Sequence, residues 1–298
     1  MNYHILGKST LEVSAIGFGC MSLGNDHAAN ATLIQQAIDG GINYFDTADI
    51  YQQGFNEITL GKAIAGKRKD VLIATKAGNQ LRDDGNGFNW NASKQYILSA
   101  VEGSLKRLGT DYIDLYQLHG GTIDDPIDET IEAFEQLQQE GKIRYYGISS
   151  IRPNVIREYV DRSKMSSVMM QYSMLDRKPE ESCLPLLKQH EIGVLARGSV
   201  AKGLLIDKPA VTYLNYSEKD VEQAARAVQH CVTPLRGATQ VALRFVLQQP
   251  GITAAIVGIR NTEQLNEALK TIDSPLLSAD ELELLRNAIP LHVFDQHR

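Results

Sequence analysis

The chain has 298 residues, 43% of them hydrophobic, and a formal net charge of −6. Barrel folds commonly use this length as one unit, so we expect residues 1–298 to form a single domain. The acidic balance argues against a general nucleic-acid surface. No window approaches the roughly 18 apolar residues of a membrane span, and the start, MNYHILGKST, lacks the apolar core of a signal peptide. We therefore expect a cytoplasmic protein.

The three cysteines, Cys20, Cys183 and Cys231, lie far apart and show no CxxC spacing. An odd and scattered set indicates neither a disulfide framework nor a zinc site. We expect reduced thiols and interpret Cys20, near the first strand, as a packed side chain.

Short apolar runs alternate with longer amphipathic stretches along the whole chain. The runs that we predict to be strands span residues 15–19, 42–46, 71–76, 112–119, 143–149, 167–172, 192–197 and 253–257. Between them, helical candidates place apolar residues three and four apart, with glycine near several ends. These candidates include 30–41, 93–109, 128–142 and 238–249. Eight β-α units predict an α/β fold of the (β/α)8 TIM-barrel type.

Three segments fall outside this eightfold repeat. Residues 3–14, YHILGKSTLEVS, read as two short strands around a Gly-Lys-Ser turn, and we expect this N-terminal β-hairpin to close the bottom of the barrel. A long stretch from about Gly198 to Leu235 carries its own helix near 217–230, and a final C-terminal helix is predicted near 278–289. Loops as long as the first of these stretches usually bind something.

Four chemically complementary residues lie at or just after the ends of predicted strands two to four. Asp46 and Tyr51 belong to DTADIY, Lys76 ends VLIATK and His119 ends DLYQLH. Taken singly, each has an ordinary structural interpretation, such as a helix cap or a solvated charge. Because the carboxyl ends of TIM-barrel strands carry the active site, we expect all four to converge on one mouth, which favours a catalytic role.

These four residues form a set suited to proton transfer. A phenol has an ordinary pKa of about 10, so Tyr51 donates a proton near neutral pH only if its phenolate is stabilised. The Lys76 ammonium would stabilise it, the Asp46 carboxylate would hold the ammonium, and the His119 imidazole would hydrogen-bond the substrate oxygen. The expected substrate group is a carbonyl.

From IGFGCMSLG through these residues to GISS, QYSML and IVGIRNTEQLNEAL, the chain resembles the bacterial aldo-keto reductases. The resemblance covers nearly the whole sequence. It implies an NADP-dependent oxidoreductase that reduces aldehydes and ketones to alcohols, with Asp46, Tyr51, Lys76 and His119 as a catalytic tetrad. By that resemblance Tyr51 is the general acid, with its pKa lowered by Lys76, and a neutral His119 orients the carbonyl.

The same resemblance implies how NADPH is held. Ser149 and Gln171 match the pair that hydrogen-bonds the nicotinamide carboxamide, and GSVAKGLLI matches the loop over the pyrophosphate. GIRNTEQ opens a helix whose N-terminus, with Arg260, suits an adenosine 2′-phosphate and favours NADPH over NADH. The implied cofactor-binding residues are Gly19, Met21, Asp46, Ser149, Ser150, Gln171, Arg197, Gly198, Ser199, Lys202, Gly203, Leu204, Gly258, Arg260, Gln264 and Glu267.

Three positions depart from the family pattern. Arg197 stands where many members have an aromatic residue against the nicotinamide, Ser150 follows Ser149 in place of an asparagine, and Ala268 replaces a common asparagine. A guanidinium can stack on a planar ring, but the nicotinamide becomes cationic on oxidation. We hypothesise that Arg197 disfavours bound NADP⁺ and so favours reduction; the alternative is that it binds a phosphate.

We expect substrate contacts from Tyr51, His119, Met21 and Trp90. Trp90, the only tryptophan, lies in the loop after strand three, where it is either a pocket wall or an anchor of that loop. With Phe88 and Phe55 near the rim, we expect an apolar wall for small aldehydes and ketones, without a particular one being indicated.

Two other classes of function remain open. An NADPH-binding regulatory subunit that senses redox state would keep the tetrad with little turnover. A metal-dependent lyase or hydrolase would need a cluster of ligands at strand ends, where His119 stands alone. We expect a small-molecule aldehyde or ketone as partner, no nucleic acid, no membrane, no metal, and a monomer or small homo-oligomer.

Overall fold

The computed structural model describes residues 1–82 and 84–298. Within these residues eight parallel strands close into a barrel in the order β10-β11-β12-β3-β4-β5-β8-β9. The barrel strands are β3 Ile16–Gly19, β4 Tyr44–Asp46, β5 Leu72–Ala77, β8 Ile113–Leu118, β9 Ile143–Ser149, β10 Ser167–Gln171, β11 Gly193–Arg197 and β12 Ile252–Gly258. Each predicted strand is present within two residues of its expected bounds, and the predicted TIM barrel is confirmed.

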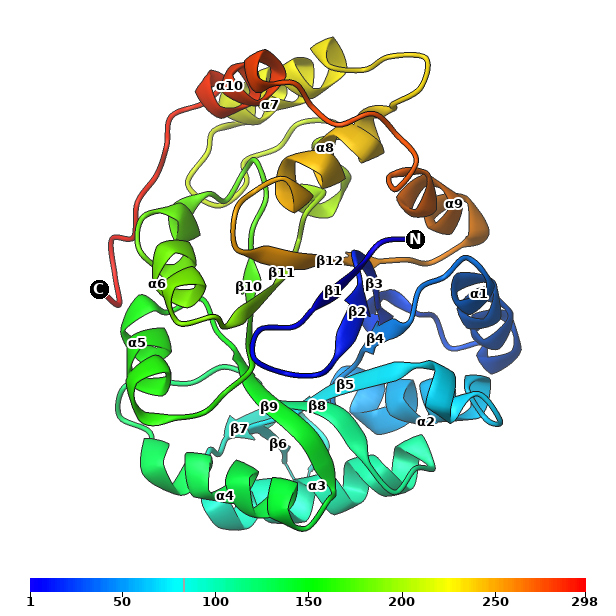
Figure 1. Ribbon diagram of the computed structural model, residues 1–298, viewed down its shortest axis with the longest axis vertical. Coiled ribbons are helices and arrows are strands. Elements are labelled where there is room, and N and C mark those ends of the chain that lie inside the picture. Colours follow the sequence, from blue (N-terminus) through cyan, green and yellow to red (C-terminus); the bar gives the residue numbers. More distant parts are fainter. Residues whose placement is uncertain (83) are drawn as a thin grey trace.

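Helices surround this barrel (Figure 1). Their bounds are α1 His27–Asp39, α2 Phe55–Ala63, α3 Lys94–Leu108, α4 Ile127–Gln139, α5 Pro153–Arg162, α6 Cys183–Gln189, α7 Glu218–His230, α8 Ala238–Leu247, α9 Thr262–Lys270 and α10 Ala279–Asn287. Helix α7, in the long segment after β11, packs on α10 near the C-terminal end. Both helices that we predicted outside the eightfold repeat are therefore present.

Capping residues fix several helix ends. The Asp26 carboxylate accepts hydrogen bonds from two amides of the first turn, so α1 begins at His27, three residues before the predicted start. Gly109, at φ 64°, ends α3 in the left-handed conformation. Ser217 and Ser278 open α7 and α10 with capping boxes, which is why both polar-faced helices start where the sequence indicated.

The N-terminal hairpin closes the bottom of the barrel, as predicted. Its strands, β1 Tyr3–Ile5 and β2 Glu12–Ser14, lie in front of the barrel in Figure 1. Leu6, Leu11 and Val13 are buried against the barrel interior. The interior side chains that they join are Tyr44, Ala74, Leu115, Met169, Leu195, Ala254 and Ile256. Because the hairpin plugs the amino ends of the strands, the opposite end is left as the mouth.

A second hairpin, β6 Asn79–Leu81 with β7 Phe88–Trp90, lies behind the barrel in Figure 1, in the loop after β5. The sequence analysis treated this segment as a loop. Its strands have three residues each, which is too short for a period to be recognised in the sequence.

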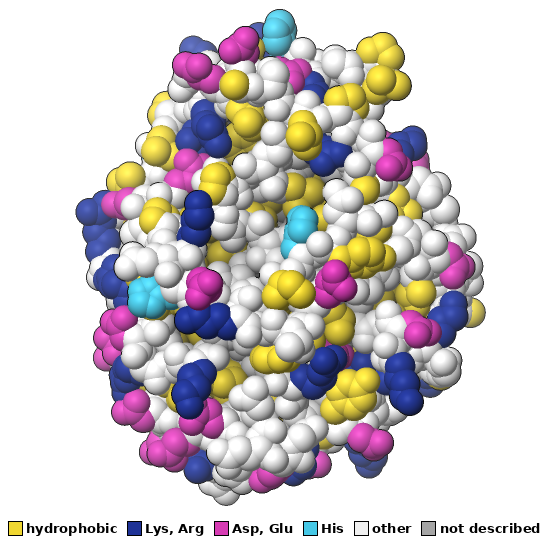
Figure 2. Space-filling view, viewed as in Figure 1, with side chains coloured by type: hydrophobic (Ala, Val, Ile, Leu, Met, Phe, Trp, Pro, Cys, Tyr) yellow, Lys and Arg dark blue, Asp and Glu magenta, His cyan; other side chains and the backbone are white. Residues whose placement is uncertain are grey.

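Positive and negative side chains are interspersed over the face seen in Figure 2, which has the hairpin end of the barrel toward the viewer. Among the described residues, Cys20, Cys183 and Cys231 are buried and form no disulfide. No helix in the described part of the chain has the length and apolar character needed to cross a membrane.

Candidate active site

The four predicted catalytic residues meet at the carboxyl end of the barrel. Asp46 is the last residue of β4, Lys76 lies one residue before the end of β5, and His119 directly follows β8. The Lys76 ammonium donates to Asp46 Oδ1 at 2.6 Å and to the Thr47 carbonyl at 2.7 Å. Both Lys76 and Asp46 are buried, with exposed fractions of 1% and 5%, so this ion pair is shielded from solvent.

Tyr51 joins this pair from the loop after β4. Lys76 Nζ lies 5.2 Å from the centroid of the Tyr51 ring. The His119 ring meets the Tyr51 ring edge-on, with centroids 5.7 Å apart and planes at 81°. The sequence analysis expected the phenol, ammonium, carboxylate and imidazole to share one mouth, and the distances place them together.

A left-handed turn fixes Tyr51 in this position. Gln52, Gln53 and Gly54 have φ values of 51°, 55° and 86°, and two of these three residues are not glycine. The Gln52 amide donates to the Leu23 carbonyl at 2.8 Å, which ties the turn to the loop after β3. The left-handed region is costly for non-glycine residues, so the surrounding contacts must hold this turn.

The charges around the tetrad decide its protonation states. Burial lowers the pKa of the Lys76 ammonium, but the adjacent Asp46 carboxylate and Tyr51 raise it, and the net shift is upward. Lys76 is therefore a cation at neutral pH. Burial, then Lys76 and Arg197, lower the pKa of His119 to about 3, so its imidazole is neutral, as expected.

The pKa of Tyr51 differs from the sequence expectation. Burial raises this pKa, Lys76 lowers it and Asp46 raises it, so that the net shift is upward from the ordinary value. The Lys76 contribution has the predicted sign, but burial outweighs it. Tyr51 is consequently a protonated phenol over the neutral range, the state that a proton donor requires.

Predicted nicotinamide contacts occupy the next three strand ends. Ser149 ends β9, Gln171 ends β10 and Arg197 ends β11. Arg197 Nη1 donates to Gln171 Oε1 at 3.0 Å. The same guanidinium lowers the pKa of His119 and contributes in the same direction at Asp46 and Tyr51.

The backbone of the segment after β11 can come close to a bound group. Gly198, Lys202 and Gly203 all have positive φ, at 73°, 58° and 92°. The Lys202 side chain is exposed, whereas Ser199 and Leu204 are buried. Glycine and left-handed residues expose backbone amides, which suits an anionic group.

Glycines also open the barrel rim between β3 and β12. Gly19 and Gly258 are paired across these two strands. A Cβ on Gly258 would approach Ser22 Oγ to 2.6 Å, so a side chain there would crowd the rim. Met21, just beyond Gly19, is 66% exposed at the same edge.

The predicted adenosine-side residues lie just before α9 and on its first turns. Arg260 is exposed, and its backbone amide donates to Gln264 Oε1 at 3.0 Å. Asn261 caps the helix by accepting from the Gln264 amide. Glu267 accepts from Lys270 Nζ at 2.6 Å and from Gln240, so its carboxylate is engaged within the protein.

Trp90 anchors its loop at the mouth. Its indole N–H donates to Asp125 Oδ1 at 2.7 Å. A Cβ on Gly78 would lie 2.8 Å from the indole ring, and one on Gly120 would lie 3.1 Å from it. The ring thus lies over the residues that follow Lys76 and His119. Phe88 is half exposed, whereas Phe55 stacks on the His27 imidazole at 4.0 Å and packs between α1 and α2.

Sequence reasoning missed a second buried charge cluster beside Tyr51. Glu57 has no exposed surface and accepts from Arg107 Nε and Thr75 Oγ1, each at 2.6 Å. Asp49 lies next to it, 8% exposed, with one oxygen 3.3 Å from the Tyr96 hydroxyl. Asp49 stands in DTADIY itself, but its position in a loop gave no signal of burial.

Sequence reasoning also missed Gln117. It lies in DLYQLH, two residues before His119, and has no exposed surface. A glutamine inside an apolar strand is the signal that could have marked it, because barrel strands are buried on both faces.

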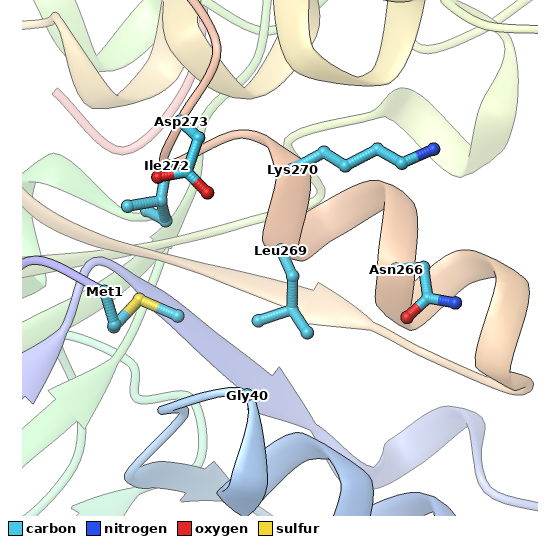
Figure 3. Close-up of a pocket in the computed structure, with 7 residues that line it drawn as sticks. All are labelled: Met1, Gly40, Asn266, Leu269, Lys270, Ile272 and Asp273. Atoms are coloured by element: carbon cyan, nitrogen blue, oxygen red, sulfur yellow. The ribbon is translucent and has the colours of Figure 1, made fainter.

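Two further features bear on the choice of function. In the described part of the chain, no group of three His, Cys, Asp or Glu side chains is arranged to hold a metal ion. A pocket of about 370 Å³ lies away from the tetrad, at the ends of α1 and α9 beside Met1 (Figure 3). Its lining includes none of the predicted catalytic or cofactor residues.

Comparisons with known proteins agree with this geometry. A model of the aldo/keto reductase family matches residues 15–290. The chain is 49% identical to the uncharacterized oxidoreductase YqkF of Bacillus subtilis (strain 168), with 98% of both chains covered. It is 32% identical to the aldo-keto reductase YhdN of the same organism, over 94% of this chain and 91% of that protein.

Solved structures give the same result. The holo form of the aldo-keto reductase AKR11C1 from Bacillus halodurans matches with a TM-score of 0.94 and 47% identity, covering 100% of this chain and 99% of that one. The apo form of the same protein matches with a TM-score of 0.86 and 45% identity, at the same coverage. The structure therefore resembles the holo form more closely than the apo form.

Proposed function

Because the chain belongs to the aldo/keto reductase family and is thus an NAD(P)H-dependent oxidoreductase, we propose that it reduces aldehydes and ketones with NADPH. The observation that carries the proposal is the buried Asp46–Lys76 pair with Tyr51 and His119 around it. We further propose that the 298-residue chain acts in the cytoplasm as one barrel domain, as a monomer or a small homo-oligomer.

In this proposal Tyr51 donates the proton to the carbonyl oxygen. Its pKa is raised by burial, so the phenol is protonated before reaction, and Lys76 stabilises the phenolate that remains. Asp46 fixes Lys76, and neutral His119 donates a hydrogen bond that orients the carbonyl. Bound NADPH supplies the hydride.

The residues around the mouth fit that cofactor. Asp46 Oδ2 is buried and has no hydrogen-bond partner among the described residues, so it can accept from a bound hydroxyl. Ser149 and Gln171 would hold the carboxamide, and the backbone from Gly198 to Gly203 would hold the pyrophosphate. The exposed Arg260 supports a 2′-phosphate and hence NADPH over NADH.

We also propose that Arg197 disfavours NADP⁺ relative to NADPH. Its hydrogen bond to Gln171 and its influence on His119 support a position facing the nicotinamide side of the mouth. Like unit charges about 4 Å apart repel by about 4 kcal/mol at an effective dielectric of 20. A tenfold affinity ratio needs about 1.4 kcal/mol, so the effect survives strong screening.

Titration of both nucleotides into wild type, Arg197→Tyr and Arg197→Lys tests this idea. We expect Arg197→Tyr to raise NADP⁺ affinity relative to NADPH by about tenfold, and Arg197→Lys, which keeps the charge, to retain the wild-type ratio. An unchanged NADP⁺ to NADPH affinity ratio in Arg197→Tyr would refute the proposed effect of Arg197.

The main proposal is tested by loss of NADPH absorbance with a panel of aldehydes. We expect Tyr51→Phe to lower kcat about a hundredfold or more, because the general acid is lost. Tyr3→Phe makes the same chemical change on the hairpin at the other end of the barrel and should keep wild-type activity. Full activity in Tyr51→Phe would overturn the role of Tyr51. Tight NADPH binding without turnover of any carbonyl would favour a redox-sensing subunit instead.

A further inference from the structure

Gln117 is a fully buried amide beside the tetrad with no evident structural purpose. It lies on β8 between Leu115, which faces the barrel interior, and His119, and alternation along a strand turns all three side chains inward. Within residues 1–82 and 84–298, neither Gln117 Nε2 nor Oε1 has a hydrogen-bond partner. A buried unsatisfied polar group costs about 1 to 3 kcal/mol in general, so an amide retained here requires a compensating role.

A chemical complement to this amide is the second oxygen of Asp46. Asp46 Oδ2 is likewise buried and unpartnered among the described residues. Gln117 stands opposite Lys76 in the pairing of β8 with β5, and Lys76 reaches back to Asp46 on β4. The amide therefore lies in the same interior layer as the ion pair.

Lys76 cannot fill that second oxygen itself. An ammonium has three donors, and two of them go to Asp46 Oδ1 and the Thr47 carbonyl. Tyr51 lies beside the same ammonium, with Nζ 5.2 Å from its ring centroid, and raises the pKa of Lys76. Oδ2 is therefore left to other donors, and a carboxylate oxygen can accept from two of them. Besides a bound hydroxyl, the amide nitrogen of Gln117 is a buried donor on β8, the strand next to Lys76.

The ionised state of Asp46 depends on such donors. Burial raises the pKa of this carboxyl, whereas Lys76, Arg197 and the Gln117 amide each act to lower it. The amide makes no direct hydrogen bond to a described residue, but its place opposite Lys76 puts it on the strand next to that of the ion pair's lysine. The nitrogen must be the atom turned toward Oδ2, because two facing oxygens would repel.

We propose that Gln117 is a positioning residue that donates from Nε2 to Asp46 Oδ2 and keeps the carboxylate ionised and aimed at Lys76. Gln117 does not touch the carbonyl. It acts through Asp46 on Lys76, and through Lys76 on the acidity of Tyr51. This inference rests on the proposed reductase function.

Other charged groups face Asp46 and must be considered in any pH profile. They are Lys76 on β5, Tyr51 after β4, Tyr44 on β4 beneath it, Arg197 on β11 and Cys20 after β3. Burial and the Asp46 charge raise the pKa of Tyr44 and of Cys20, so both stay neutral over the range of the assay. Lys76, Arg197 and Tyr51 are present in the variants below, which leaves the amide as the one difference.

The first test replaces Gln117 with methionine, which has the same length and no donor. We expect Gln117→Met to lower kcat about tenfold or more, with the dissociation constant for NADPH changed less than about twofold. Asp46 then competes for the Lys76 proton, so Lys76 stabilises the Tyr51 phenolate less. The alkaline limb of the kcat profile should move to higher pH, because Tyr51 then loses its proton later. A purely structural role would lower kcat without moving this limb.

The second variant, Gln117→Glu, tests the donor directly. Its carboxyl can donate to Asp46 only when protonated, so activity relative to wild type should recover as the pH falls. The thermal midpoint of each variant, read by circular dichroism, separates loss of fold from loss of function. If Gln117→Met does not fold, Gln117→Glu decides the question. The inference is overturned if the activity of Gln117→Glu relative to wild type does not rise as the pH falls.

Failure of this inference and failure of the proposed function give different results. If wild type reduces the aldehyde and Tyr51→Phe does not, but Gln117→Met keeps wild-type kcat and pH profile, the role of Gln117 is refuted and the function stands. If Tyr51→Phe is fully active, the chain of influence from Gln117 to Tyr51 is refuted together with the mechanism.

Discussion

Asp49 makes folding stability depend on pH in a direction opposite to that of ordinary carboxylates. Its side chain is 8% exposed, and Oδ1 has no hydrogen-bond partner within the described residues. Burial raises the pKa of Asp49, as does the neighbouring Glu57 carboxylate, while Arg107 lowers it; the result is about 7 against an ordinary 3.8. The other groups facing it are the Tyr96 hydroxyl on α3 and Tyr116 on β8.

The sign follows from proton binding. Between about pH 4 and pH 7 folded Asp49 keeps a proton that the unfolded chain releases, so the free energy of unfolding falls as the pH rises through this window. The loss starts above the unfolded pKa and is complete above the folded one. A difference of about three pKa units at 1.36 kcal/mol each amounts to about 4 kcal/mol at most.

Asp49→Asn removes this dependence, because asparagine stays neutral. We expect the variant to exceed wild type by about 1.5 kcal/mol at pH 5 and by up to about 4 kcal/mol at pH 8. The unfolding entropy of a chain of this size is about 0.6 kcal/mol per degree, so the thermal midpoint at pH 8 should rise by up to about 6 °C.

Circular dichroism melts of both proteins at several pH values from 5 to 8 measure this effect. Asp111→Asn, which neutralises an exposed aspartate, controls for the change in net charge and should run parallel to wild type. If the gap between Asp49→Asn and wild type is the same at pH 5 and pH 8, the reasoning about Asp49 is refuted.

Two further predictions concern packing and charge away from the mouth. Asp114 is 1% exposed, and its carboxylate lies 2.7 Å from Arg68. Arg68→Met leaves it with Arg144 as its remaining cation and should lower the free energy of unfolding, measured in denaturant, by about 2 to 3 kcal/mol. Arg226→Met removes an exposed ion pair with Glu222 on one helix and should lower the free energy of unfolding by less than about 0.5 kcal/mol. Equal losses in Arg68→Met and Arg226→Met would refute the predicted effect of burial. Gly61→Ala drives a methyl group onto the Leu108 backbone, with its carbonyl carbon 2.7 Å away, and should lower the free energy of unfolding by about 2 kcal/mol. The added methyl group of Gly24→Ala meets no described atom within 4 Å. This variant should change the free energy of unfolding by less than about 0.5 kcal/mol, measured in the same way.

The residues of the mouth were predictable because strands that follow one another along the chain are neighbours in a parallel barrel, and their carboxyl ends lie at the same end of it. Asp46, Lys76 and His119 lie at or beside the ends of adjacent strands β4, β5 and β8, so a correct strand assignment is enough to bring them together. The strands were recognisable because they are buried on both faces and read as apolar runs. The hairpin was recognisable by its turn residues.

Other features were not predictable, because they depend on which side chains a loop buries. Asp49 and Glu57 look like ordinary polar residues, and only the packing of α2 and α3 beside the Tyr51 turn makes them a buried cluster. The pKa of Tyr51 was expected to fall beside Lys76, but the sequence does not state how deeply the phenol is buried. Burial is a property of the assembled barrel, so its balance against a nearby charge cannot be read from spacing.

The position of Tyr51 is determined from both sides of the barrel wall. Asp46 points inward and binds Lys76, whereas Asp49, three residues later, joins the outer cluster of Glu57 and Arg107. The Arg107 side chain lies over Gly54, where an added Cβ would be 2.6 Å from its Cδ, and so presses on the left-handed turn that carries the phenol. In the proposed mechanism the inner charge pair sets the chemistry of Tyr51, and the outer pair holds its backbone. It follows that a variant of the outer cluster can change kcat through the placement of the phenol while the Asp46–Lys76 pair stays intact.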